Sequence, residues 1–79
     1  MEKIRLLIVD DQVLFLESLS TFLRNYAEDI EVVGLARNGR QALEKAAALR
    51  PDIVLMDVHM PVMDGVEATG RLIESQPGV

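Results

Sequence analysis

The sequence contains no cysteine and no tryptophan, and only two phenylalanines and one tyrosine among its 79 residues. The lack of cysteine excludes a disulfide framework and any thiolate chemistry. Because aromatic side chains are few, a core must be built from Leu, Ile, Val and Ala, as is common in layers packed on a parallel sheet. A hydrophobic fraction of 49% still supplies enough apolar material for one small domain.

Positive charge is also scarce, because eight Lys and Arg stand against thirteen Asp and Glu and give a formal net charge of −5. This balance argues against direct binding of nucleic acid or of an anionic membrane surface, both of which favour basic patches. No apolar run approaches the roughly 20 residues that span a bilayer, and the N-terminus has no signal-peptide pattern. We therefore expect a cytoplasmic protein without a membrane partner.

Apolar segments alternate with segments of helical periodicity along the chain. The expected strands are Ile4–Val9, residues 30–35 and Ile53–Met56. The expected helices cover residues 12–26, residues 40–49 and a segment from about Gly65, the last two capped by Asn38-Gly39 and Asp64-Gly65. The order βαβαβα with short connections predicts right-handed crossovers and a parallel α/β sheet with helices on both faces.

The spacing of apolar residues also predicts which helix faces are buried. On the first helix these residues are Phe15, Leu16, Leu19, Phe22, Leu23 and Tyr26. On the third helix they are Val66, Thr69, Leu72 and Ile73. We further expect Asp11 to cap the first helix, and Glu67 and Arg71 to form an ion pair along the third.

Acidic residues follow two of the expected strands at the point where each strand ends. Asp10 and Asp11 come directly after Val9, and Asp57 comes directly after Met56. If these strands are parallel neighbours, the three carboxylates emerge at the C-terminal edge of one sheet, where open α/β folds bind ligands. Three like charges so close repel one another unless a divalent cation compensates them, and oxygen ligands suit Mg²⁺ better than zinc. The pattern predicts a magnesium site around a reactive aspartate.

Three motifs in this order make the chain resemble the receiver domain of bacterial two-component response regulators. The motifs cover residues 7–12, residues 36–42 and residues 51–65, and the likeness extends over nearly the whole chain. The resemblance implies a flavodoxin-like (CheY-like) fold. Residues 31–34 and 65–69 look like the LuxR-type subfamily, whose members usually carry a C-terminal DNA-binding domain.

The resemblance implies a role for each acidic residue. Asp57 would accept a phosphoryl group from the phosphohistidine of a sensor histidine kinase, and would thereby control transcription through the output domain. Asp11 and Asp57 would ligate Mg²⁺ directly, Asp10 would act mostly through a water molecule, and the backbone carbonyl of His59 would complete the ligands. The chain would thus be a signalling module, with self-phosphorylation chemistry only in the intact domain, and not an enzyme.

In the family, two further βα units bring a Ser or Thr and a Lys that contact the phosphoryl group. Residues 1–79 hold only the first three units, so we interpret them as a truncated receiver domain that is impaired in phosphotransfer. Without a fourth strand, Ile53–Met56 would be an apolar edge, and such edges pair with other chains. This predicts a homodimer or higher oligomer, formed through this strand or through exchanged elements.

The sequence is also compatible with two other functions. One is a small Mg²⁺-dependent phosphohydrolase or phosphotransferase on a related sheet. Residues 57–61 lack the second acid that haloacid-dehalogenase-like enzymes carry two residues after their nucleophile. The other is a purely structural dimerising fragment without chemistry.

Overall fold

Strands and helices alternate along the chain in the computed structural model, which describes residues 3–57 and 63–79. The strands are β1 (Ile4–Val9), β2 (Ile30–Ala36) and β3 (Ile53–Met56). The helices are α1 (Val13–Tyr26), α2 (Gly39–Leu49) and α3 (Gly65–Ser75). The strands are parallel in the order β2-β1-β3, with β1 in the centre. This confirms the predicted βαβαβα arrangement and the strand order that begins a flavodoxin-like sheet.

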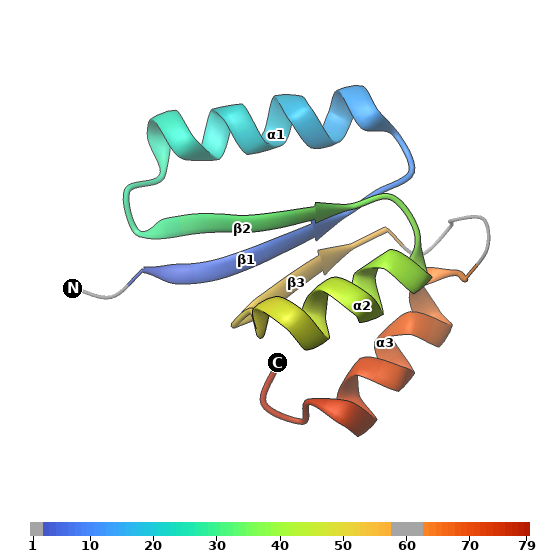
Figure 1. Cartoon of the computed structure of the whole chain (residues 1–79). Coiled ribbons are helices and arrows are strands. Elements are labelled where there is room, and N and C mark those ends of the chain that lie inside the picture. The colour runs from blue at the N-terminus through green and yellow to red at the C-terminus, as the bar shows by residue number, and fades with distance from the viewer. Residues whose placement is uncertain (1–2, 58–62) are drawn as a thin grey trace.

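The helices cover both faces of the sheet, with α1 on one face and α2 and α3 on the other (Figure 1). Because β1 lies between two strands and two helical layers, its side chains alternate between two buried clusters. Leu6 and Ile8 pack with Leu16 of α1. The other cluster consists of Leu7, Val9, Ala36, Ala42, Ala46 and Leu72. The core is therefore aliphatic, as the shortage of aromatic residues predicts.

Side chains cap α2 and α3 at their first turns, as predicted. The Asn38 side-chain oxygen accepts a hydrogen bond from Gln41 N at 2.9 Å. The Asp64 carboxylate accepts one from Glu67 N at 2.9 Å. Each cap satisfies an N–H group that the helix itself leaves without a partner. The predicted ion pair between Glu67 and Arg71 is also present, at 3.1 Å.

The buried face of α3 differs from the prediction. Leu72 is 3% exposed, but the other residues predicted on this face are exposed, namely Val66, Thr69 and Ile73. The buried residues of α3 are Gly65, Ala68 and Leu72. The physical reason is that α3 packs against α2, whose own buried residues are glycine and alanine. Small residues on both helices let the two backbones approach closely. The spacing of apolar residues in the sequence does not reveal this preference for small side chains.

Helix α1 also buries a narrower face than its apolar spacing predicts. Leu16 is buried and Leu19 and Leu23 are half-buried, whereas Phe15, Phe22 and Tyr26 are exposed. The rings of Phe22 and Tyr26 lie against each other, with centroids 5.0 Å apart. These aromatic side chains therefore pair on the helix surface and do not extend the core.

The two edges of the sheet differ in what covers them. At the β2 edge, Lys45 of α2 donates a hydrogen bond from Nζ to the carbonyl oxygen of Leu35. At the other edge, β3 pairs with β1 and has no second neighbouring strand within residues 3–57 and 63–79. Ile53 and Leu55 of β3 are 48% and 50% exposed. Apolar side chains thus lie open beside an unpaired strand edge, a combination that favours association.

Candidate metal centre

The register between β1 and β3 brings three carboxylates together at the C-terminal edge of the sheet. Val9 pairs with Met56, so Asp10 and Asp57 leave neighbouring strands at the same level. Asp57 N donates to Val9 O at 3.0 Å and holds the two strand ends side by side. One carboxylate oxygen from each of Asp10, Asp11 and Asp57 lies within 4.8 Å of the other two. The predicted convergence of the three acids is therefore observed.

Hydrogen bonds hold Asp10 to the end of β2 and to the start of α1. Asp10 N donates to Ala36 O, at the end of β2, at 3.0 Å. The Asp10 carboxylate accepts a hydrogen bond from Gln12 N at 2.9 Å. Gln12 is the N-cap residue of α1 and its side chain makes no capping hydrogen bond, so the prediction that Asp11 caps this helix is wrong. The cause is local, because Asp10 binds the N–H at the turn and leaves Asp11 exposed.

The geometry and chemistry of this cluster fit Mg²⁺. With Mg–O distances of 2.0–2.1 Å, two ligand oxygens lie at most about 4.2 Å apart. Oxygens within 4.8 Å of one another therefore need only a small side-chain rotation, or one intervening water. Asp10 and Asp57 are half-buried, where a charge is screened less by salt than at the open surface. His59 lies outside the described residues, so the role of its carbonyl group stays a prediction.

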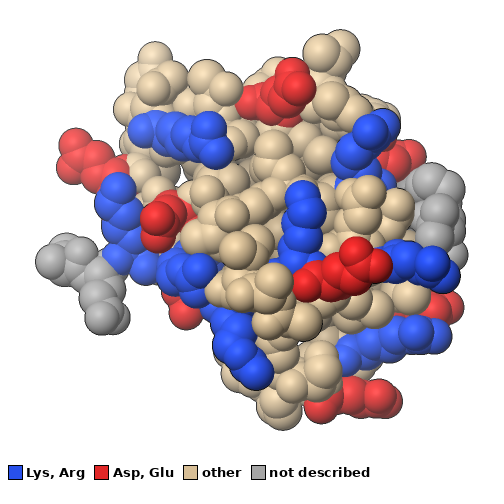
Figure 2. Space-filling view, in the orientation of Figure 1, with Lys and Arg blue, Asp and Glu red and all other residues tan. Residues whose placement is uncertain are grey.

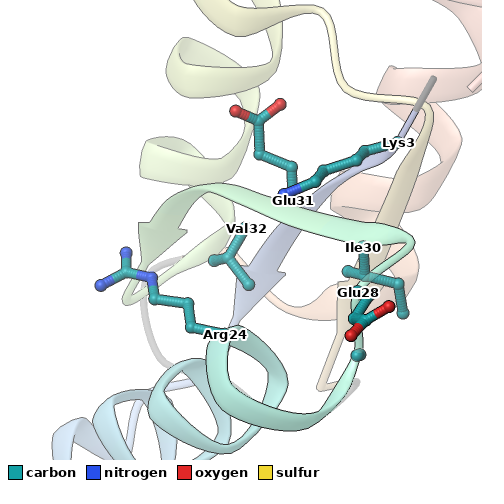
Figure 3. Close-up of a pocket in the computed structure, with 7 residues that line it drawn as sticks. Lys3, Arg24, Glu28, Ile30, Glu31 and Val32 are labelled. Atoms are coloured by element: carbon teal, nitrogen blue, oxygen red, sulfur yellow. The ribbon is translucent and has the colours of Figure 1, made fainter. Parts of the chain in front are cut away.

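Within the described ranges, no other three acidic or histidine side chains come together in this way. An open hollow of about 530 Å³ lies at the opposite end of the sheet, between the end of α1 and the start of β2 (Figure 3). Its charged residues are Lys3, Arg24, Glu28 and Glu31. Two positive and two negative groups give it no preference for a ligand of one sign. The hollow therefore does not compete with the acidic cluster as a chemical site.

Charge on the surface is mixed. Figure 2 shows acidic side chains interspersed among basic ones over the visible face. No helix in the described part of the chain has the length and apolar character needed to cross a membrane.

Sequence reasoning missed one contact near the cluster. Gly39 N, at the start of α2, donates to Met63 O at 3.1 Å. A glycine directly after the capping residue Asn38 was the available signal, because glycine often marks a close approach of two backbones. The sequence could not identify the segment that approaches it.

Comparisons with known proteins agree with this arrangement. The profile of the response regulator receiver domain matches residues 6–79. A protein-glutamate methylesterase/protein-glutamine glutaminase from Geobacillus kaustophilus (strain HTA426) is 49% identical over 77 residues, which are 98% of this chain and 22% of that protein. The transcriptional regulatory protein LnrK from Bacillus subtilis (strain 168) is 47% identical over 76 residues, which are 96% of this chain and 34% of LnrK.

A solved structure shows the same likeness in three dimensions. The response regulator domain of Thermotoga maritima CheB superimposes with a TM-score of 0.90 at 37% identity, over 96% of this chain and 56% of that chain. The chain has the flavodoxin-like, CheY-like fold of these proteins, and it belongs to the response regulator receiver domain family. It is thus a receiver module of two-component signalling, and it spans roughly a fifth to a third of the length of these two curated relatives.

Proposed function

We propose that Asp57 of this chain accepts a phosphoryl group from the phosphohistidine of a sensor histidine kinase. The observation that carries the proposal is the meeting of the Asp10, Asp11 and Asp57 carboxylates within 4.8 Å at the edge where this fold binds ligands. We assign Asp11 and Asp57 as direct ligands of Mg²⁺, Asp10 as a ligand through water, and the His59 carbonyl as a further ligand. Bound Mg²⁺ would supply the positive charge that screens the carboxylates from the incoming phosphate oxygens.

The chain's own residues perform the rest of the chemistry. A carboxylate oxygen of Asp57 attacks phosphorus, the bond from phosphorus to the kinase imidazole nitrogen breaks, and that nitrogen keeps the electron pair. The backbone hydrogen bond from Asp57 N to Val9 O holds the nucleophile at the end of the sheet during this step. The Asp10 carboxylate, bound by Gln12 N, adds negative charge beside it. The product is an aspartyl phosphate.

The chain has two lysines, Lys3 and Lys45, and the structure gives each of them other surroundings than the acidic cluster. Lys45 Nζ donates to Leu35 O, and Lys3 lines the hollow at the opposite end of the sheet. We therefore propose that residues 1–79, as the first three βα units of a receiver domain, transfer phosphoryl groups slowly. Positive groups that meet the developing phosphoryl charge normally accelerate such a transfer.

We also propose a role in transcription through a LuxR-type DNA-binding output domain, in a cytoplasmic protein. Support comes from the 47% identity to LnrK, which is named a transcriptional regulatory protein. The 49% identity to a protein-glutamate methylesterase favours a different output. The gene sequence after residue 79 separates the two. A helix-turn-helix region there supports the transcriptional role, and a methylesterase domain overturns it.

The apolar β3 edge favours self-association. We propose that the 79-residue chain forms a homodimer or higher oligomer through β3 or by exchange of elements. Support comes from the exposed Ile53 and Leu55 beside the unpaired edge. Association without phosphorylation would correspond to a purely structural function for this chain.

Incubation with Mg²⁺ and acetyl phosphate, followed by intact-mass spectrometry, tests the phosphoacceptor. We expect one phosphoryl group on the wild-type chain and none on Asp57→Asn. Asp64→Asn is the matched control, since it makes the same change of carboxylate to amide at the cap of α3, where Asn caps as well as Asp. This control should keep the adduct. An adduct that persists in Asp57→Asn contradicts the assignment, and turnover of unrelated phosphate esters by the wild type would instead indicate a phosphohydrolase.

A further inference from the structure

The open edge of β3 has apolar side chains on both faces of the sheet. Side chains alternate between the two faces along a strand. On the α3 side, a hollow of about 140 Å³ lies beside the strand, and its lining residues are Val54, Met56, Thr69, Leu72, Ile73 and Val79. On the α1 side, Ile53 and Leu55 are half-exposed. A strand edge beside an apolar hollow is the arrangement by which sheets bind an added strand.

Helix α3 supplies a second sign that something covers this surface. Thr69 and Ile73 belong to the apolar stripe that the sequence predicts to be buried, yet they line the hollow, and Ile73 is 57% exposed. An apolar cavity of about 150 Å³ holds a group of the size of benzene. The hollow therefore has room for one apolar side chain from outside, which would complete the burial of this stripe.

The hydrogen bonding of β3 determines which of its backbone groups point outward. Asp57 N donates to Val9 O of β1. Alternate residues of a paired strand direct their N–H and C=O groups to the same neighbour, so Ile53 and Leu55 also face β1. The corresponding groups of Val54 and Met56 face the open edge, and the side chains of the same two residues line the hollow.

A second copy of β3 matches this edge. An added strand needs apolar residues on both of its faces, and the sequence Ile-Val-Leu-Met of β3 is apolar throughout and carries no charge. β2 contains the exposed Glu31, and β1 lies in the centre of the sheet. Antiparallel pairing about a two-fold axis perpendicular to the sheet brings hollow beside hollow, and it closes as a dimer.

The outward-facing groups also select a register. In an antiparallel pair, opposite residues share a face, and hydrogen-bonded pairs form between residues whose backbone groups face each other. Pairing Val54 with Met56 of the second copy, and Met56 with its Val54, gives two hydrogen-bonded pairs within β3. Pairing Val54 with Val54, or Met56 with Met56, gives only one. The first register places Leu55 opposite Leu55 of the second copy.

We propose that the β3 edge is a self-complementary docking surface, on which β3 of a second copy pairs antiparallel with Leu55 opposite Leu55. This inference rests on the proposed self-association and deepens it by naming the surface and the register. Met56 of each copy then lies beside Val54 of the other, at the hollow. Ile53 lies opposite Asp57 of the second copy, so the paired segment ends where the acidic cluster begins.

Disulfide cross-linking tests the register, because the chain has no cysteine and a single introduced thiol reports one position. Opposite residues of a pair without mutual hydrogen bonds have Cα atoms about 4.5 Å apart, within the range of about 4.4–6.8 Å that a disulfide spans. We expect mild oxidation of Leu55→Cys to give a dimer of twice the mass that reduction reverses. Ile53→Cys is the matched control, since Ile53 is equally exposed on the same face. Its two thiols would lie four residues out of register, about 13 Å apart, and it should keep the mass of one chain.

A second measurement uses the wild-type chain and so does not depend on either variant folding. Hydrogen exchange of the Val54 and Met56 amides should slow as the chain concentration rises through the dimerisation range, whereas the Leu55 amide, which faces β1, should change less. Unchanged exchange of Val54 and Met56 in a dimeric chain overturns the inference. Cross-linking of Ile53→Cys as readily as Leu55→Cys also overturns it. A wild type that light scattering shows to be monomeric at every concentration is a separate outcome, which overturns the proposed self-association and the inference with it.

Discussion

Ser20 illustrates how a single residue departs from the apolar pattern around it. It lies on the buried face of α1, and its hydroxyl oxygen has no hydrogen-bond partner among the described residues. A buried hydroxyl group without a partner costs about 1–3 kcal/mol. Ser20→Ala is therefore expected to raise the free energy of unfolding by about 1 kcal/mol, measured by urea denaturation followed by circular dichroism.

Ser18→Ala is the control for this prediction, because Ser18 is exposed on the same helix. Both substitutions gain helix propensity, which contributes about 0.5 kcal/mol or less. Only Ser20→Ala also removes a buried polar group. Equal stability of the two variants would show that the Ser20 hydroxyl carries no such cost.

At the residue scale, the meeting of the three acids was predictable from the sequence, and the contact of Gly39 with Met63 was not. Asp10, Asp11 and Asp57 follow apolar runs, and parallel neighbouring strands end at one edge, so their meeting follows from the strand order alone. Gly39 gave only a local signal, which correctly predicted a helix start. Its contact with Met63 depends on the path of the chain between distant elements, and local propensity contains no information on that path.

At the scale of elements, the strands and helices agree with the prediction to within a residue or so, while the buried helix faces do not. Element ends were signalled by caps such as Asn38 and Asp64, whose hydrogen bonds are local. The faces depend on what each helix packs against. The close packing of α3 on α2 favours Gly65 and Ala68 over the larger Val66, which is 70% exposed.

The β3 edge leads to a prediction about association. Leu55→Lys places a charge on the exposed apolar side of this strand and should shift the 79-residue chain toward monomer, because lysine at a sheet edge opposes pairing with another chain. Val66→Lys is the control, since it introduces the same charge at an exposed apolar position on α3. Size-exclusion chromatography with light scattering measures the outcome. A well-folded monomer in the wild type would refute the proposed association.

At the scale of the whole molecule, the acidic cluster lies at one end of the sheet, and the hydrophobic core lies on its two faces. The acids gather where the parallel strands end, and the layers of α1 on one side and of α2 and α3 on the other enclose β1 (Figure 1). A chain of this size buries only about 60% of the surface that its unfolded form exposes. A bound cation that favours the folded state adds stability in proportion to the logarithm of its concentration, so Mg²⁺ and the fold support each other.

The central claim is that Asp10, Asp11 and Asp57 form a single site for a divalent cation. Diffraction from crystals of this chain grown with Mn²⁺, which accepts the same oxygen ligands as Mg²⁺, tests it most directly. We predict one anomalous peak between the three carboxylates, within ligand distance of Asp11 and Asp57. A cluster without a peak at saturating Mn²⁺, or carboxylates that lie too far apart to share one ion, would contradict the account.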